Sequence, residues 1–149
     1  MKVDVKELKV RYARTSKGIK DIREKYGASI DDLVNKAFDK DSGMPYFVAG
    51  AIVVILHNEK AVATCIYSRR DNTIYCVCVD EEYRHNKLCH KLMEKCIFIM
   101  KTDKRFSDDK RYARLFSNNP VAQKIYEHVG FITNNTEPYG ELKFYKLDF

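Results

Sequence analysis

A chain of 149 residues can bury a core and is no longer than one common domain, so we expect residues 1–149 to form a single domain. The apolar fraction of 45% excludes an intrinsically disordered protein. Lys and Arg outnumber Asp and Glu by 27 to 21, and the net charge of +6 favours anionic ligands without choosing among nucleic acid, an acidic protein surface and a phosphorylated cofactor.

No segment predicts secretion or insertion into a membrane. The longest apolar run, Tyr46–Leu56, is far shorter than the roughly 20 residues of a spanning helix. Residues 1–6 lack the apolar stretch of a signal peptide. We therefore expect an intracellular, cytoplasmic protein with no membrane partner.

The five cysteines predict free thiols. Their number is odd and no secretory signal precedes them, which argues against a disulfide framework. Cys76 and Cys78, with His85, Cys89 and His90 nearby, match no standard zinc spacing, so no metal site is predicted.

The N-terminal third predicts a strand followed by two helices. Val3–Tyr12 alternates imperfectly and indicates a strand, and Ile19–Tyr26 and Ile30–Phe38 have helical spacing. Ser29 with Asp32 three residues later resembles a capping box, which places the start of the second helix there.

Three strands follow in the middle of the chain. Ala51–His57 and Ala61–Ser68 are separated by a short polar turn, as in a β-hairpin. Thr73–Val79 is rich in β-branched and aromatic residues, which favour strands.

The C-terminal part alternates helix and strand. Leu88–Lys101 carries an apolar stripe at helical spacing, and Tyr112–Phe116 indicates a strand. A second helix should run from an N-cap at Asn119 to a C-terminal cap at Gly130, and Glu141–Phe149 alternates well enough for a final strand. This order predicts an α/β protein, with a mixed sheet flanked by helices.

The segment between Val79 and the helix at Leu88 is a candidate anion site. Free backbone N–H groups and the positive end of the helix dipole favour an anion at a helix N-terminus. Arg84, His85 and Lys87 add positive charge to the same loop, so a pyrophosphate group is the natural ligand.

Two blocks of this chain resemble the GNAT (GCN5-related N-acetyltransferase) superfamily. The loop Tyr83–Cys89 resembles the family's Tyr-Arg pair and its Arg/Gln-x-x-Gly-x-Gly/Ala pyrophosphate loop, with Lys87 and Cys89 in place of the glycines. The block Asn119–Phe131 matches Asn-x-x-Ala-x-x-x-Tyr-x-x-x-Gly-Phe in full. The resemblance covers about residues 45 to 149. A left-handed backbone at either substituted glycine would cost about 1–2 kcal/mol.

The resemblance implies the GNAT fold and acetyl-CoA as the cofactor, with direct transfer of the acetyl group to a primary amine of a small molecule or protein. Tyr126 would protonate the departing thiolate. Val77 and Val79 would offer backbone groups to the pantetheine arm and the acyl carbonyl, and Asn119 would also contact that arm. The predicted pyrophosphate contacts are Arg84, His85, Asn86, Lys87, Leu88 and Cys89.

The general base stays open at this stage, because Ile74–Val79 contains no carboxylate. The residues considered as bases are Glu59, Asp71, Glu81 and Glu82, with Tyr75 or Tyr112 as relays through water. Cys89 or Cys78 as an acyl-carrying nucleophile is an alternative. An inactive GNAT-fold protein that binds CoA or a protein is a second function, and a basic nucleic-acid-binding module a third. No nucleic acid is expected, and a homodimer is left open.

Overall fold

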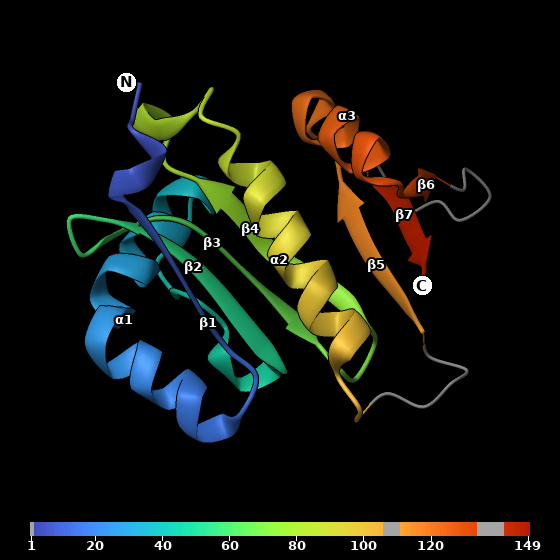
Figure 1. Cartoon of the computed structure of the whole chain (residues 1–149), viewed down its shortest axis with the longest axis horizontal. Coiled ribbons are helices and arrows are strands. Elements are labelled where there is room, and N and C mark those ends of the chain that lie inside the picture. The colour runs from blue at the N-terminus through green and yellow to red at the C-terminus, as the bar shows by residue number, and fades with distance from the viewer. Residues whose placement is uncertain (1, 106–110, 134–141) are drawn as a thin grey trace.

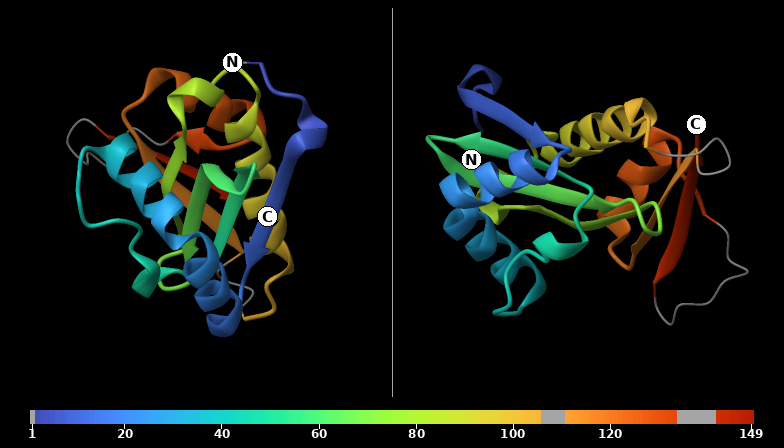
Figure 2. Two further views of the ribbon diagram at one scale, coloured as in Figure 1. Left: turned by 90° about the vertical axis from the view of Figure 1, so that its left-hand side faces the viewer. Right: turned by 90° about the horizontal axis from the view of Figure 1, so that it is seen from below.

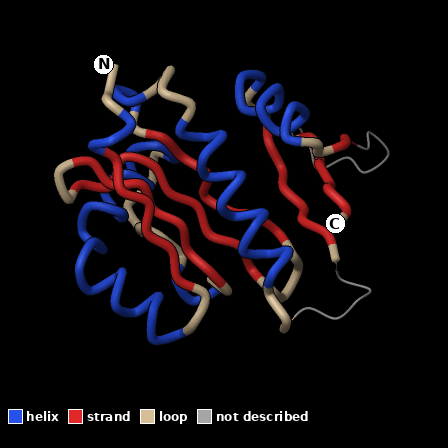
Figure 3. Tube along the Cα trace, viewed as in Figure 1, coloured by secondary structure: helices blue, strands red, loops and turns tan. Residues whose placement is uncertain are grey.

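The computed structural model describes residues 2–105, 111–133 and 142–149. Within them, one seven-stranded sheet has the order β1-β2-β3-β4-β5-β7-β6 (Figures 1 and 3). In chain order the elements are η1 (Val5–Glu7), β1 (Leu8–Ala13), α1 (Ser16–Phe38), η2 (Tyr46–Val48), β2 (Ala51–His57), β3 (Lys60–Ser68), β4 (Thr73–Val79), η3 (Glu81–Tyr83), α2 (Leu88–Thr102), β5 (Tyr112–Ser117), α3 (Pro120–Val129), β6 (Ile132–Thr133) and β7 (Lys143–Asp148).

Helices cover both faces of the sheet, as predicted for a mixed α/β protein. Strands β1 to β4 pair antiparallel, β4 and β5 pair parallel, and β5, β7 and β6 pair antiparallel. The right-hand view of Figure 2 shows α1 on one side of the sheet and α2 on the other. Each helix packs on its own buried apolar cluster, with Ile52 and Ile66 under α1 and Val53 and Cys65 under α2.

The prediction of two helices before β2 is wrong, because α1 is one helix of 23 residues. It begins at an N-cap, Thr15, whose Oγ1 accepts a hydrogen bond from the Gly18 N–H at 3.0 Å. The predicted capping residue Ser29 lies inside α1, and its Oγ accepts from the Ala61 N–H at 2.8 Å. An interior glycine, Gly27, costs about 1 kcal/mol. That cost is outweighed by the continuous buried stripe of Ile19, Ile22, Tyr26, Ile30, Leu33 and Val34.

The predicted first strand begins too early. Val5–Glu7 forms a 3-10 turn because the Asp4 carboxylate accepts from the Lys6 N–H at 3.0 Å, and β1 starts only at Leu8.

The β2–β3 hairpin is confirmed, with Asn58 and Glu59 at positive φ (51° and 65°) as in a two-residue type I′ turn.

The C-terminal elements follow the prediction closely. The N-cap at Asn119 and the left-handed C-cap at Gly130 are both present in α3. The last strand is β7, Lys143–Asp148; the beginning of the predicted strand, at Glu141, lies outside the described residues. Among the helices of the described ranges, none has both the length and the apolar composition needed to span a membrane.

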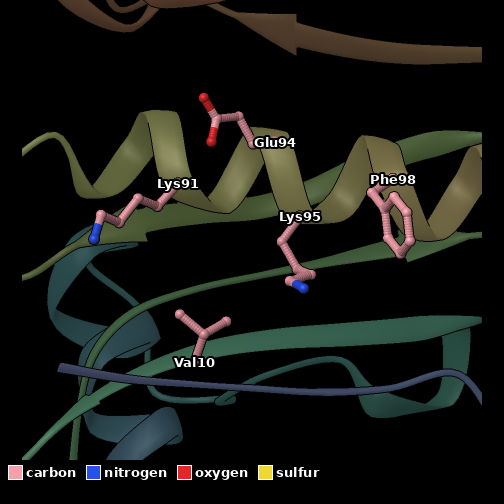
Figure 4. A pocket seen from close by; sticks show the side chains of 5 residues that line it. All are labelled: Val10, Lys91, Glu94, Lys95 and Phe98. Atoms are coloured by element: carbon pink, nitrogen blue, oxygen red, sulfur yellow. The ribbon is translucent and has the colours of Figure 1, made fainter.

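Beside the edge strand β1, α2 leaves a shallow groove on the surface. Figure 4 shows Lys91, Lys95 and Phe98 of α2 on the side of Val10 of β1. The Lys95 ammonium lies 5.6 Å from the centroid of the Phe98 ring, which is about half exposed. Besides these two lysines, the groove is lined by one acidic side chain, Glu94.

Candidate functional site

Strand β4 carries a bulge in its middle. Tyr75 pairs with Ile66 and Cys78 with Thr64, so Cys76 and Val77 lie opposite a single residue of β3. Cys76 has a left-handed backbone with φ 57°. A bulge of this kind adds a residue, disrupts the ladder and bends the strand. The backbone of Val77 therefore lies outside the regular pairing with β3.

Strands β4 and β5 diverge beyond their first residues. Thr73 and Arg114 are the one registered pair in the described residues, supported by a bond from the Arg114 N–H to the Asn72 carbonyl at 2.8 Å. Figure 1 shows β5 leading away from β4 toward α3. From Ile74 to Val79 the edge of β4 that faces β5 is thus outside the described ladder, and its polar groups can serve a ligand.

A hydrogen-bond network holds the loop between β4 and α2. The Asn86 side-chain amide donates to the Tyr83 carbonyl at 2.9 Å, and its oxygen accepts from the Val3 N–H at 3.0 Å. His57, at the end of β2, joins the Tyr83 hydroxyl at 2.7 Å to a carboxylate oxygen of Glu7 at 3.1 Å. The network fixes the loop from its inner side and leaves the Arg84 and His85 side chains exposed.

Lys87 and Cys89, at the positions of the family's glycines, have different backbones. Lys87 is the N-cap of α2 and is left-handed, with φ 59° and ψ 28°, so a side chain there costs about 1–2 kcal/mol. Cys89 is the second residue of α2, so its backbone is helical and its side chain adds no such strain. The Lys87 side chain makes no capping hydrogen bond. The first N–H groups of α2, from Leu88 on, therefore face outward without an intrahelical partner.

Tyr126 of α3 lies against the start of α2. Its side chain is 4% exposed, and Cys89 packs against the cluster to which it belongs. Burial and the nearby Cys89 raise the pKa of Tyr126 well above its usual value, so the phenol is protonated at neutral pH. Edge contacts to Phe131 and Tyr145 hold the ring in place. A protonated phenol held this way is suited to give a proton to a leaving group.

The two cysteines considered as nucleophiles are poorly activated. Burial raises the pKa of the Cys89 thiol to about 11, and burial raises the pKa of Cys78 further. Because the thiolate is the nucleophile, both groups carry little of the reactive form at neutral pH. No group of three or more His, Cys, Asp or Glu side chains suited to a metal ion occurs in the described ranges.

The predicted site residues fall into three places. Val77 and Val79 lie on the α2 side of β4, packed on the cluster that also contains Tyr126. Arg84 to Cys89 form the loop and the first turn of α2. The hydrogen bonds of Asn119 stay local, since its oxygen accepts from two N–H groups of α3. The structure thus brings Tyr126 and Cys89 into contact and leaves Asn119 engaged as a helix cap.

Comparison with known families settles the relationship. The model of a family described as "Acetyltransferase (GNAT) domain" matches residues 49–133. The chain belongs to the GNAT acetyltransferase family. The match contains the bulged strand, the loop, α2 and α3.

Solved GNAT-fold structures resemble the whole chain. An acetyltransferase from Streptococcus agalactiae is 15% identical, with 96% of this chain and 99% of that chain covered and a TM-score of 0.69. An acyl-CoA N-acyltransferase from Pseudomonas aeruginosa is 15% identical, with 93% and 98% covered and a TM-score of 0.71. These likenesses show the fold.

A third structure holds a ligand. A proposed streptothricin acetyltransferase from Bacillus anthracis, in complex with acetyl coenzyme A, is 18% identical, with 66% and 63% covered and a TM-score of 0.54. No curated protein matches this chain significantly in sequence.

The local geometry of this GNAT chain fits a CoA thioester. The first turn of α2 has no side-chain cap, which leaves N–H groups for a pyrophosphate. The edge of β4 beyond Thr73 offers backbone groups to a narrow ligand such as a pantetheine arm. Three features of the site were not predicted from the sequence: the bulge, and the contributions of His57 and Glu7. Their contacts join residues 26 and 50 positions apart, so no local spacing could have found them.

Proposed function

We propose that residues 1–149 act as one domain that transfers an acetyl group from acetyl-CoA directly to a primary amine. The observation that carries the proposal is that three features adjoin one packed cluster on the α2 face of the sheet. These are the uncapped start of α2, the free edge of the bulged β4, and the Tyr126 phenol beside Cys89.

The proposed binding roles follow from the backbone. N–H groups at the start of α2 hold the pyrophosphate, and Arg84 and Lys87 add charge from the same loop. Backbone groups of Val77 and Val79 hold the pantetheine arm and orient the acyl carbonyl. The side-chain NH2 of Asn119 also contacts that arm, while its oxygen caps α3.

The proposed catalytic roles follow from the surroundings of two groups, the Val77 backbone and the Tyr126 phenol. Acetyl-CoA supplies an acyl thioester. The backbone at Val77 polarises the carbonyl, because bulge N–H groups outside the ladder can point at a developing oxyanion. Tyr126 donates its proton to the sulfur as the thiolate departs, which its raised pKa permits because the proton is still present at neutral pH.

The test is a pair of measurements on the purified chain. Isothermal titration calorimetry should give acetyl-CoA binding that weakens with salt, since charged phosphates are bound. A thiol-release assay with a panel of primary amines should then show amine-dependent release of CoA. Absence of acetyl-CoA binding at millimolar concentration contradicts the proposal.

An inactive binding protein is the second candidate, and the left-handed Lys87 is the observation that favours it. A side chain at this point adds strain and bulk where the family has glycine. This candidate predicts acetyl-CoA binding without thiol release in the presence of any amine of the panel.

A further inference from the structure

A pocket opens on β4 where β5 diverges from it. It has a volume of about 330 Å3 and is lined by Ile74, Tyr75, Cys76, Phe116 and Leu142. The bulge places Tyr75 and Cys76 on the same face, so both pack on the cluster under α1, whereas Val77 packs on the cluster under α2. Tyr75 and Cys76 therefore line the pocket from the face opposite Tyr126, whereas Ile74 belongs to the cluster that contains Tyr126.

The Tyr75 hydroxyl has a fixed acidic partner. It donates to one carboxylate oxygen of Asp71 at 2.5 Å, and the other oxygen accepts from the Thr73 N–H at 3.2 Å. Burial, followed by the bond to Asp71, raises the pKa of Tyr75, so the phenol remains protonated at neutral pH. The phenol oxygen retains a lone pair for a second donor.

Few charged groups surround this pair. Arg114 of β5 donates to the Thr73 hydroxyl at 3.1 Å and acts on Tyr75 through its charge. Lys40, just after α1, acts on the neighbouring Cys76. Asp71 is thus the acidic partner of Tyr75, and Arg114 is the cation that acts on Tyr75 from another element.

The two tyrosines lie on opposite sides of the sheet. Tyr126 belongs to the cluster under α2, and Tyr75 packs on the cluster under α1. In acyl transfer the nucleophile and the leaving group occupy different sides of the carbonyl carbon. We propose that Tyr75 is the catalytic proton acceptor for the attacking amine and that Asp71 is the positioning residue that receives the proton through it. This inference rests on the proposed function.

The step is balanced as a proton relay. The neutral amine forms a bond to the acyl carbon, and its nitrogen becomes cationic. An N–H proton passes to the Tyr75 oxygen while the Tyr75 hydroxyl proton passes to Asp71. The bond from carbon to sulfur breaks, and the sulfur takes the proton of Tyr126. Asp71 then returns its proton to solvent, and Tyr126 takes up a proton from solvent.

The pocket walls also indicate the acceptor class. Ile74, Phe116 and Leu142 are apolar, and Leu142 is 40% exposed at the rim. A primary amine with an alkyl or aryl group next to the nitrogen would bury that group against them.

Tyr112, the other phenol considered as a relay, is paired opposite Asp148. It lies 4.6 Å below the Lys146 ammonium and is not part of the pocket lining. It is a matched control.

The experiment uses 2-phenylethylamine as the probe. With CoA present, the amine should shift the backbone NMR signals of Tyr75, Cys76 and Phe116. With acetyl-CoA, kcat should fall about 100-fold or more in Tyr75→Phe and Asp71→Asn, and should be retained in Tyr112→Phe. The loss in Tyr75→Phe should shrink as pH rises, because hydroxide replaces the missing acceptor, whereas a purely structural defect would be the same at each pH.

Each outcome decides the inference. The inference is supported if Tyr75→Phe and Asp71→Asn lose kcat as described and bind acetyl-CoA with unchanged affinity. Wild-type kcat in Tyr75→Phe overturns it, as does a loss that does not change with pH. If the wild-type chain binds acetyl-CoA but neither binds nor acetylates the probe, this inference fails and CoA binding stands. If acetyl-CoA does not bind at all, the proposed function fails with it.

Discussion

Tyr126 combines deep burial with a neighbouring thiol, and both raise its pKa. We expect Tyr126→Phe to lower kcat by about 100-fold or more, because the leaving thiolate then lacks a proton donor. Affinity for acetyl-CoA should change little, because pyrophosphate binding lies in the loop before α2. Since the pKa of Tyr126 is raised, wild-type kcat should show no alkaline loss from this group up to about pH 9.

The control for Tyr126 is Cys89→Ala, which removes the neighbouring thiol and keeps the phenol. We expect this variant to retain most of its activity. A Tyr126→Phe enzyme as fast as the wild type, measured by thiol release at saturating acetyl-CoA, would rule out the proton-donor role.

Lys87 and Cys89 provide a direct comparison of two glycine positions. We expect Lys87→Gly to raise the free energy of unfolding by about 1 kcal/mol, because it removes a side chain from a left-handed backbone. Cys89→Gly should lower that free energy by about 1 kcal/mol, since Cys89 is helical. Urea unfolding of both variants measures the difference, and equal effects would contradict this account of the loop.

At the scale of a single element, the bulge of β4 depends on the left-handed Cys76. Cys76→Val should destabilise the chain by about 2 kcal/mol or more, because a β-branched residue is strained at positive φ. Cys76→Gly should be the better tolerated of the two. At Cys78, two residues later and in ordinary strand conformation, the order should reverse, with glycine worse than valine. Thermal unfolding of the four variants tests this, and the same order at both positions would refute it.

The sequence predicted elements best where their signals are local. The β2–β3 hairpin, the caps of α3 and the start of α2 at Leu88 all follow from a few adjacent residues. The continuity of α1 was missed because Gly27 and Ser29 look like a break. Their surroundings decide otherwise, since Gly27 is buried and Ser29 bonds to β3.

The site was predictable only in part for the same reason. The loop and Tyr126 lie in two short sequence blocks, and each block could be recognised by itself. The bulge of β4 depends on its register with β3, and nothing in the run from Thr73 to Val79 marks it. Likewise, the hydrogen bond from Tyr75 to Asp71 depends on how the strand bends after the β3–β4 turn.

At the scale of the whole molecule, a buried carboxylate at the end of α2 links folding to pH. Asp103 is 3% exposed and accepts hydrogen bonds from Tyr67 at 2.5 Å and from Arg105 at 2.6 and 2.8 Å. Burial alone would raise the pKa of Asp103, but the bonds from Arg105 and Tyr67 outweigh it and hold that pKa well below its usual range.

Because the folded pKa of Asp103 lies below the unfolded value of about 3.9, its contribution is present above that pH and is lost as pH falls further. We expect Asp103→Asn to lower the free energy of unfolding at neutral pH by about 2–4 kcal/mol. The deficit relative to wild type should narrow below about pH 4. Urea midpoints across pH measure it. A deficit that is constant with pH would show that the carboxylate charge is not what matters.

Within the described residues, Thr73 and Arg114 are the one registered pair between β4 and β5, so the sheet consists of two halves joined at this point. With so few backbone bonds there, β5 and β7 can open from β4 at low cost, so their amide hydrogens should exchange faster than those of β2 and β3. A thioester arm lying along β4 would act as a substitute strand. At about 100 times its dissociation constant it would add about 2.7 kcal/mol of stability, and hydrogen exchange would slow in β5 before it slows elsewhere. If the exchange rate in β5 does not depend on the ligand, the two halves are held together without it. The cofactor would then bind to the sheet without adding to its strand pairing.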